Sequence, residues 1–252
     1  METRRLTVEL GLPEGRLHVE MDVPTGMVPM RALLPALRTT ADAFVAYAGE
    51  VSEALGKPVS CAKGCGACCR QLVPVAPSEA RRIADLVAEL PEPRRSEVSG
   101  RFAEAVRRVE EGGLLGPLDD RPAWETGDAV EVGTAYVRLG IACPFLEDES
   151  CSIYAERPLA CREYLVSSPP SRCASPTRSA VETIPLPTRV WAAAAREEEG
   201  VPASAPAPWV PLVLAPRWAA ESREEPVRPG PDLLRGVYSR FARDRSGAGE
   251  PR

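Results

Sequence analysis

The stretch Cys61-Ala-Lys-Gly-Cys65-Gly-Ala-Cys68-Cys69 brings four thiols together within nine consecutive positions of the chain. The remaining thiols follow after a long interval without cysteine, at Cys143, Cys151, Cys161 and Cys173. Free thiols are prone to oxidation, so their concentration in two groups indicates a chemical role. Disulfides and metal coordination are the two roles that such a pattern supports.

The N-terminal sequence shows no export signal, which bears on the choice between disulfides and metal. Residues 1–10 alternate polar and apolar side chains, without the apolar core or the small-residue cleavage site of a signal peptide. No apolar run approaches the roughly 20 residues that are needed to cross a bilayer. We therefore expect a cytoplasmic protein without a membrane partner, in which thiols stay reduced and metal is favoured over disulfides.

Composition limits the partners and the kind of metal site. The chain has 252 residues and a net charge of −5, and this acidic balance argues against nucleic acid as a partner. It contains 1 histidine, which excludes sites built from two or three histidines. Coordination by thiolates alone leaves zinc or iron as the metal, the latter as an iron–sulfur cluster.

The first cysteine group has the spacing of a metal-binding turn. Cys65 and Cys68 form a C-x-x-C pair, and Gly64 and Gly66 give the backbone the freedom to turn both thiolates onto one ion. Neighbouring side chains diverge in a helix or a strand, so Cys69 is not expected to bind the same single ion as Cys68. Two adjacent metal sites and one iron–sulfur cluster with further thiols nearby are both compatible with this pattern.

The second cysteine group contains two arginines beside its thiols, in Arg157-Pro-Leu-Ala-Cys161-Arg162. Pro158 fits the first turn of a helix, which would place Cys161 near the positive helix end and stabilise its thiolate. Arg157 and Arg162 either pair with surface carboxylates or balance the negative charge of a metal–thiolate site. The sequence favours neither of these two interpretations.

Periodicity predicts a mainly α protein with a small N-terminal β-hairpin and an irregular cysteine-rich metal-binding core. Two segments of period two predict the hairpin within residues 3–26. Apolar residues at steps of three and four predict helices over residues 31–55, 77–90, 94–111 and 231–243, and a short helix is expected over residues 190–199. Residues 129–139 are compatible with a strand or a helix, because Gly133 disfavours both, and we favour the helix. Residues 114–127 are expected to form a loop, and the Pro-rich residues 201–216 an extended wrap on the body.

These elements divide the chain into four expected parts. Residues 1–56, the N-terminal hairpin and helix, belong to the same body as residues 57–200, the cysteine-cluster metal-binding domain. Residues 201–245 form the Pro-rich wrap and the C-terminal helix, and residues 246–252 a disordered tail.

Together the cysteine boxes resemble a known family. Cys61-x₃-Cys65-x₂-Cys68-Cys69, Cys143-Pro-Phe-Leu, Cys151-x-Ile-Tyr and Arg157-Pro-x-x-Cys161-Arg162 are similar to the YkgJ-type cysteine-cluster proteins. The first spacing is three residues here, where the pattern that names the family has two. The resemblance covers residues 61–162 and implies a zinc- or iron-chelating CxxCxxCC domain. We take as candidate metal ligands Cys61, Cys65, Cys68, Cys69, Cys143, Cys151 and Cys161, together with Cys173, which lies beyond the family's motif.

Two functions of different classes follow from these observations. The first is a cytoplasmic protein that binds zinc or iron through thiolates from two separated segments, with an iron–sulfur cluster as one form of the iron site. The alternative is a redox or protein-modifying enzyme that depends on an iron–sulfur cluster. That enzyme needs a substrate pocket near the cysteines, for which Tyr154, Arg157 and Arg162 are candidate residues. Whether the protein is an enzyme is left open by the sequence.

Overall fold

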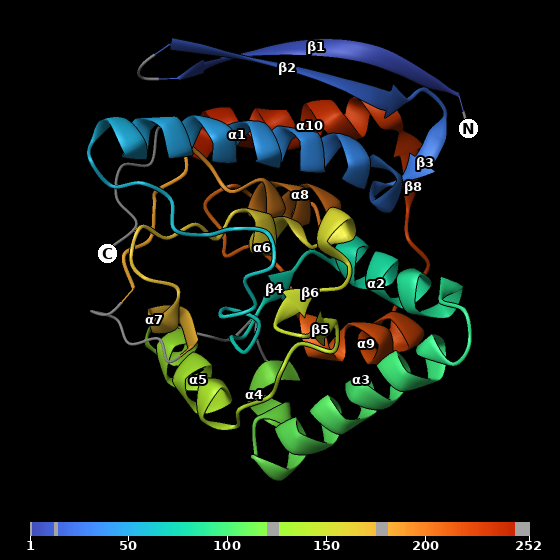
Figure 1. Ribbon diagram of the computed structural model, residues 1–252. Helices are drawn as coiled ribbons and strands as arrows, with labels where there is room; N and C mark the ends of the chain where they lie inside the picture. The colour runs from blue at the N-terminus through green and yellow to red at the C-terminus, as the bar shows by residue number, and fades with distance from the viewer. Residues whose placement is uncertain (1, 13–14, 120–125, 175–180, 245–252) are drawn as a thin grey trace.

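The computed structural model describes residues 2–12, 15–119, 126–174 and 181–244 (Figure 1). The tail at residues 246–252, which we expected to be disordered, lies outside these ranges. Within the described residues, no helix has both the length and the apolar character that a membrane span requires.

The N-terminal hairpin lies over two long helices. Strands β1 (Thr3–Leu12) and β2 (Gly15–Pro24) pair antiparallel along their whole length, as the sequence predicts. Alternate side chains of β2 are buried against α1 (Leu34–Ala54) and α10 (Gly230–Asp244), which Figure 1 shows beneath the hairpin. The single histidine, His18, is exposed on the opposite face of the hairpin, so it takes no part in the cysteine chemistry.

The remaining elements are further helices joined by short strands and turns. They are β3 (Met27–Pro29), a 3₁₀ turn (Met30–Leu33), β4 (Pro74–Val75), α2 (Pro77–Glu89), α3 (Arg94–Glu111), α4 (Leu115–Asp119), α5 (Thr126–Arg138), β5 (Leu146–Glu147), β6 (Ser150–Cys151), a 3₁₀ turn (Tyr154–Glu156), α6 (Leu159–Arg162), α7 (Ser171–Ala174), α8 (Val190–Glu198), β7 (Val210–Pro211), a 3₁₀ turn (Leu212–Leu214), α9 (Ala215–Glu221) and β8 (Val227–Pro229). The mainly helical class with an N-terminal hairpin is therefore confirmed.

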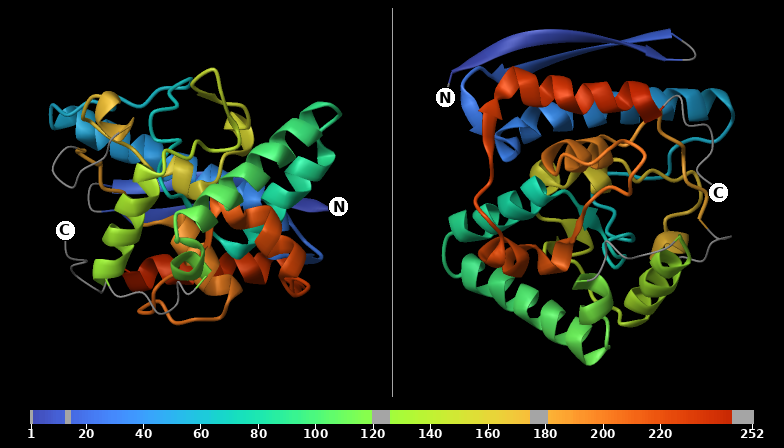
Figure 2. Two further views of the ribbon diagram at one scale, coloured as in Figure 1. Left: turned by 90° about the horizontal axis from the view of Figure 1, so that it is seen from below. Right: turned by 180° about the vertical axis from the view of Figure 1, so that it is seen from behind.

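Two hydrophobic cores hold these elements together. The first joins the hairpin, α1, α8 and α10, and Phe44 of α1 meets Phe241 of α10 edge to face at 5.6 Å between ring centroids. The second joins α2, α3 and α5 with the 3₁₀ turn Leu212–Leu214 and the start of α9. Figure 2 shows from behind how α10 and α1 lie on one side of the molecule and α2, α3 and α9 on the other. Helix α6, which carries Cys161, contacts elements on both sides, namely α1, α8 and β4.

Two segments differ from the sequence-based expectation. Residues 115–119 form α4, where a loop was expected, and part of that expected loop lies outside the described residues. Gly116 and Pro117 made these residues look like a loop in the sequence. The helix can form because Pro117 lies in its first turn, where proline is tolerated, and because Leu118 is fully buried. The second difference is the end of the Pro-rich segment, where a 3₁₀ turn (Leu212–Leu214) leads into α9, which has Pro216 in its first turn.

The Pro-rich segment lies on the body, as expected, because it completes a small sheet. Strand β7 pairs with β4, which directly follows the first cysteine group, and the Leu212 N–H donates to the Val73 carbonyl at 2.9 Å. Leu212 and its neighbours to Ala215 are buried. The wrap therefore fixes the exit of the first cysteine group against the second core.

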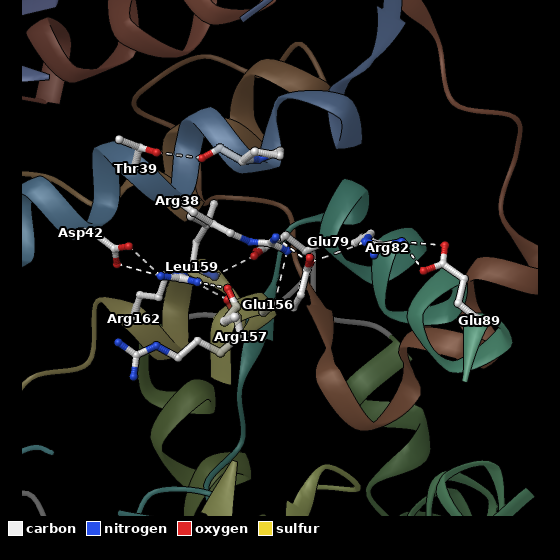
Figure 3. A network of polar contacts seen from close by, with 12 residues as sticks. Arg38, Thr39, Asp42, Glu79, Arg82, Glu89, Glu156, Arg157, Leu159 and Arg162 are labelled. Carbon is white, nitrogen blue, oxygen red and sulfur yellow. Dashed lines mark hydrogen bonds and ion pairs between the residues drawn. The ribbon is translucent and has the colours of Figure 1, made fainter. Parts of the chain in front are cut away.

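A buried carboxylate joins α2 to the helix that carries Cys161. Glu79 is 2% exposed, and its two oxygens accept the N–H groups of Ala76, at 3.1 Å, and Leu159, at 2.7 Å. The first bond completes the N-terminus of α2, and the second does the same for α6 (Figure 3). Burial raises the pKa of Glu79, while the two donated N–H groups act in the opposite direction.

Replacing Glu79 tests whether this carboxylate holds the two helices. Glu79→Ala leaves two buried N–H groups without an acceptor, so we expect it to lower the free energy of unfolding by roughly 2–5 kcal/mol. Glu89→Ala on the same helix removes only an exposed ion pair with Arg82 and is expected to cost less than about 1 kcal/mol. Urea unfolding of both variants measures the difference in their free energies of unfolding. Equal values would show that Glu79 does not stabilise the contact between α2 and α6.

Candidate metal centre

All eight cysteines line one cavity. Its volume is about 150 Å³, and its wall includes sulfur-bearing residues from both groups: Cys61, Cys65, Cys68, Cys69, Cys143, Cys151, Cys161 and Cys173. A cavity of this volume is roughly large enough for a molecule the size of benzene, and so is larger than a single metal ion requires. The two groups, separated in sequence by more than seventy residues, therefore converge on the same space.

The first cysteine group is shaped by turns and by two glycines. The Cys65 N–H donates to the Ala62 carbonyl at 3.1 Å, and the Cys69 N–H to the Gly66 carbonyl at 3.0 Å. Gly64 has a φ of +93°, a conformation that other residues rarely adopt. Gly66 is required for another reason, because a Cβ there would lie 2.5 Å from the Glu149 carbonyl oxygen. The loop thus rests directly on the turn between β5 and β6.

Backbone contacts bring the second cysteine group to this loop. The Cys143 N–H donates to the Cys69 carbonyl at 2.7 Å, which places the first cysteine of the second group beside the last of the first. Strand β6 contributes Cys151, and α6 contributes Cys161. The Gln71 amide donates to the Cys173 carbonyl at 2.9 Å, so the most distant cysteine is also tied to the first group.

Cys68 and Cys69 interact with each other, in contrast to the expectation that they would diverge. The divergence expected for neighbouring residues applies to helices and strands, and this part of the chain is a series of turns. The Cys69 thiol hydrogen-bonds the Cys68 sulfur, which lowers the pKa of Cys68 to about 7 and raises that of Cys69. Cys68 is therefore the thiol most readily ionised at neutral pH among those whose pKa is shifted.

Other thiols are held in their protonated form by their surroundings. Burial raises the pKa of Cys143 to about 12 and that of Cys173 to about 11, and the pKa of Cys161 also lies well above its usual value. The expectation that a helix N-terminus makes the Cys161 thiol acidic is therefore wrong. Helix α6 is a single turn, and its Leu159 N–H already donates to Glu79. The helix N-terminus therefore contributes little positive partial charge to stabilise the Cys161 thiolate.

The sulfurs surround the cavity without forming a closed coordination shell. In the part of the chain that the structure describes, no three Cys, His, Asp or Glu side chains form a group ready to hold a metal ion. The thiol side chains must therefore rotate inward to coordinate one. The donor set, eight sulfurs and no nearby imidazole, fits zinc or an iron–sulfur cluster and does not fit hard cations such as Mg²⁺ or Ca²⁺.

The structure distinguishes the roles of Arg157 and Arg162, between which the sequence could not decide. Arg162 is buried and clamps Asp42, with distances of 2.8 and 2.7 Å from one nitrogen to the two carboxylate oxygens. It also donates to the backbone carbonyls of Arg157 and Ala155. The Arg157 side chain extends away from this network in Figure 3 and lines the thiol cavity instead. Arg162 is thus structural, and Arg157 faces the cysteines.

Some residues that shape the cavity carried no sequence signal. Tyr164 belongs to its wall, and the Tyr164 carbonyl lies 3.9 Å from the Cys61 sulfur. Leu212 reaches the wall from the Pro-rich segment, more than fifty positions after Cys161. Both depend on long-range packing, which neither periodicity nor spacing reveals.

Comparison with known proteins agrees with this geometry. Residues 60–183 match the family model CxxCxxCC, described as "Putative zinc- or iron-chelating domain", and the match spans both cysteine groups. No curated protein and no solved structure gives a significant match. The family match supports metal chelation and leaves the choice between zinc and iron open.

Mild oxidation of the metal-free protein tests whether the two groups share one cavity. We expect disulfides that join residues 61–69 to residues 143–173, because sulfurs from both segments line the same space. Peptide mass mapping identifies the linked pairs, with protein oxidised in denaturant as the control. Disulfides confined to one group in the folded protein would contradict the convergence.

Proposed function

Because residues 60–183 belong to the CxxCxxCC family, we propose that this protein holds zinc or iron in an all-thiolate centre inside the cysteine-lined cavity. The observation that carries the proposal is that all eight cysteines line one cavity. All eight are free thiols in the structure, which is the state that metal coordination needs. We assign all eight as candidate ligands.

Buried thiols give this chain a reason to bind a cation. A thiolate in a poorly solvated site is costly unless a positive charge offsets it, and burial raises the pKa of Cys143, Cys161 and Cys173. A soft cation in the cavity replaces the thiol protons, so binding releases protons to solvent. Cys68, whose pKa is about 7, is the natural first ligand, since its thiolate is present before the metal arrives.

Two metal contents are compatible with eight sulfurs. Two structural zinc ions with four thiolates each use every cysteine, and one iron–sulfur cluster uses four and leaves the others around it. A cavity of about 150 Å³ has room for a group of several atoms, which favours a polynuclear centre over one isolated ion. When bound, such a centre supplies either structural cross-linking or electron transfer.

A second candidate function rests on the lining of the cavity. Besides the cysteines, the wall contains Tyr154 and Arg157 and apolar side chains such as Phe145, Ile153 and Leu212. An apolar pocket with a few polar groups is the usual form of a small-molecule site. An iron–sulfur-dependent redox or protein-modifying enzyme is therefore the alternative, with its substrate beside the centre.

Location and organisation complete the proposal. We propose a cytoplasmic protein, because eight closely spaced free thiols are stable only where the medium is reducing. The metal-binding unit is proposed to be residues 57–200, with residues 1–56 in the same body and residues 201–245 as a wrap and C-terminal helix. We propose no nucleic-acid partner, in keeping with the net charge of −5.

Anaerobic purification followed by metal and sulfide analysis tests the proposal. We expect zinc without visible colour or iron with acid-labile sulfide. Cys65→Ser and Cys68→Ser each remove a sulfur from the cavity wall and are expected to lower the metal content and the stability. Ser239→Ala, on the exposed face of α10, is the control and is expected to keep the wild-type metal content.

Each result of this experiment separates the candidates. Zinc alone supports a structural centre, and iron with sulfide supports a cluster and keeps the enzyme as a candidate. Wild-type metal content in both cysteine variants would remove the first group from the site. Protein without metal and without free thiols would favour disulfides and contradict the proposal.

Metal removal is expected to destabilise the fold. A ligand present at 100 times its dissociation constant contributes about 2.7 kcal/mol, which for a chain of this length is roughly 5–11 °C in unfolding temperature. Thermal unfolding before and after anaerobic treatment with a chelator measures the shift, and added metal is expected to restore it. An unchanged unfolding temperature after proven metal loss would show that the centre contributes nothing to stability.

A further inference from the structure

Arg157 has a position that its hydrogen bonds do not explain. Its guanidinium stacks on the Tyr154 ring, with the guanidinium carbon 4.2 Å from the ring centroid, and both residues line the thiol cavity. The Arg157 Nε is buried and has no hydrogen-bond partner among the described residues. A buried donor without an acceptor costs about 1–3 kcal/mol, so its position beside the thiols calls for a physical reason.

Arg157 also forms no ion pair with a carboxylate within the described residues. Four carboxylates of the neighbouring turns and of α1 are engaged by other arginines: Glu147 by Arg94 and Arg101, Glu149 by Arg70, Glu156 by Arg38 and Arg82, and Asp42 by Arg162. Within the described residues, no carboxylate lies at ion-pair distance from Arg157. A second cation, the Lys63 ammonium, lies 5.6 Å from the centroid of the same Tyr154 ring. Arg157 therefore stands in the wall of the thiol cavity without an acidic partner, and Lys63 lies on the same aromatic ring outside that wall.

The backbone that carries Arg157 is fixed by the network in Figure 3. Arg162 donates from its Nε to the Arg157 carbonyl at 3.2 Å, and Arg38 donates to the Glu156 carbonyl at 3.3 Å. These two arginines hold the chain on one side, and the Arg157 side chain lies on the other side, where it lines the thiol cavity. Its stacking on Tyr154 then sets the plane of the guanidinium.

We propose that Arg157 is a positioning residue of the thiolate centre, which donates a hydrogen bond to a ligand sulfur and balances its negative charge. The inference rests on the proposed function, because the acceptor it assigns is the sulfur of a metal–thiolate site. Four thiolates on one divalent cation leave a net charge of −2, and a guanidinium offsets part of that charge. Tyr154 orients the guanidinium, and Lys63 adds a second, more exposed positive charge.

Arg157 shares its cavity with cysteines from both groups. Cys61, Cys68 and Cys151 line the same space as Arg157. One cation thus stands beside the two segments that must meet at the centre.

The test compares variants of Arg157 with a matched arginine. Arg157→Gln removes the charge, and Arg157→Lys keeps it while losing the planar fork. Arg70→Gln is the control, because Arg70 directly follows Cys69 but is already paired with Glu149. Metal-free full-length protein is titrated anaerobically with Zn²⁺ against a competing chelator, and with Co²⁺, whose thiolate complexes absorb visible light. Circular dichroism of the metal-free variants checks that each one folds.

We expect Arg157→Gln to bind Zn²⁺ about 10- to 100-fold more weakly and to shift the Co²⁺–thiolate absorption. Arg157→Lys is expected to recover part of the affinity, and Arg70→Gln to match the wild type. Wild-type affinity in Arg157→Gln, no recovery in Arg157→Lys, or an equal loss in Arg70→Gln would each overturn the inference while leaving the metal centre in place. A wild-type protein that binds neither ion would overturn the proposed function together with this inference.

Discussion

The fold depends on the contact between the turn at Cys69 and the turn at Cys143. One backbone hydrogen bond of 2.7 Å joins these residues, and Gly66 lets the first loop rest on the β5–β6 turn without a side chain between them. On either side, buried carboxylates place the helices that carry or flank the cysteines. Glu79 joins α2 to α6, and Glu163, which directly follows α6, accepts the Val190 N–H at the start of α8. Sulfurs from distant parts of the chain share one cavity because of these few polar contacts.

The cavity holds two opposing electrostatic tendencies. Burial and neighbouring thiols keep most shifted cysteines protonated, whereas Arg157 and the Cys69 hydrogen bond favour the thiolate at Cys68. A soft cation resolves this opposition, because it replaces protons that are costly to remove without it. The two surrounding cores consist mainly of apolar side chains, and Cys143 packs against the second of them. The protein is thus organised as a stable frame around a site whose ionisation depends on what binds there.

Much of this organisation could be predicted from local patterns. Period two predicted the hairpin, and steps of three and four predicted α1, α2, α3 and α10, because each of these elements buries one face against a core. Helix α8 was expected as a short helix, and at α5 the sequence allowed a strand as well as a helix. Helix α4 was not predicted, because Gly116 and Pro117 are typical of a loop. The helix is stabilised instead by the tertiary packing of Leu118, which is fully buried. The raised pKa of Cys161 was not predicted, because it is caused by burial and not by the helix that carries the residue. The different roles of Arg157 and Arg162 could not be separated, since they depend on Asp42, which is far away in sequence.

X-ray absorption spectroscopy of the protein purified without oxygen tests the central claim most directly. The account predicts a first shell of sulfur alone around the metal, at about 2.3 Å for zinc–thiolate bonds, with a metal–metal distance in addition if the centre is a cluster. A first shell dominated by nitrogen or oxygen at about 2.0–2.2 Å would contradict it, because those donors do not line this cavity in the numbers required.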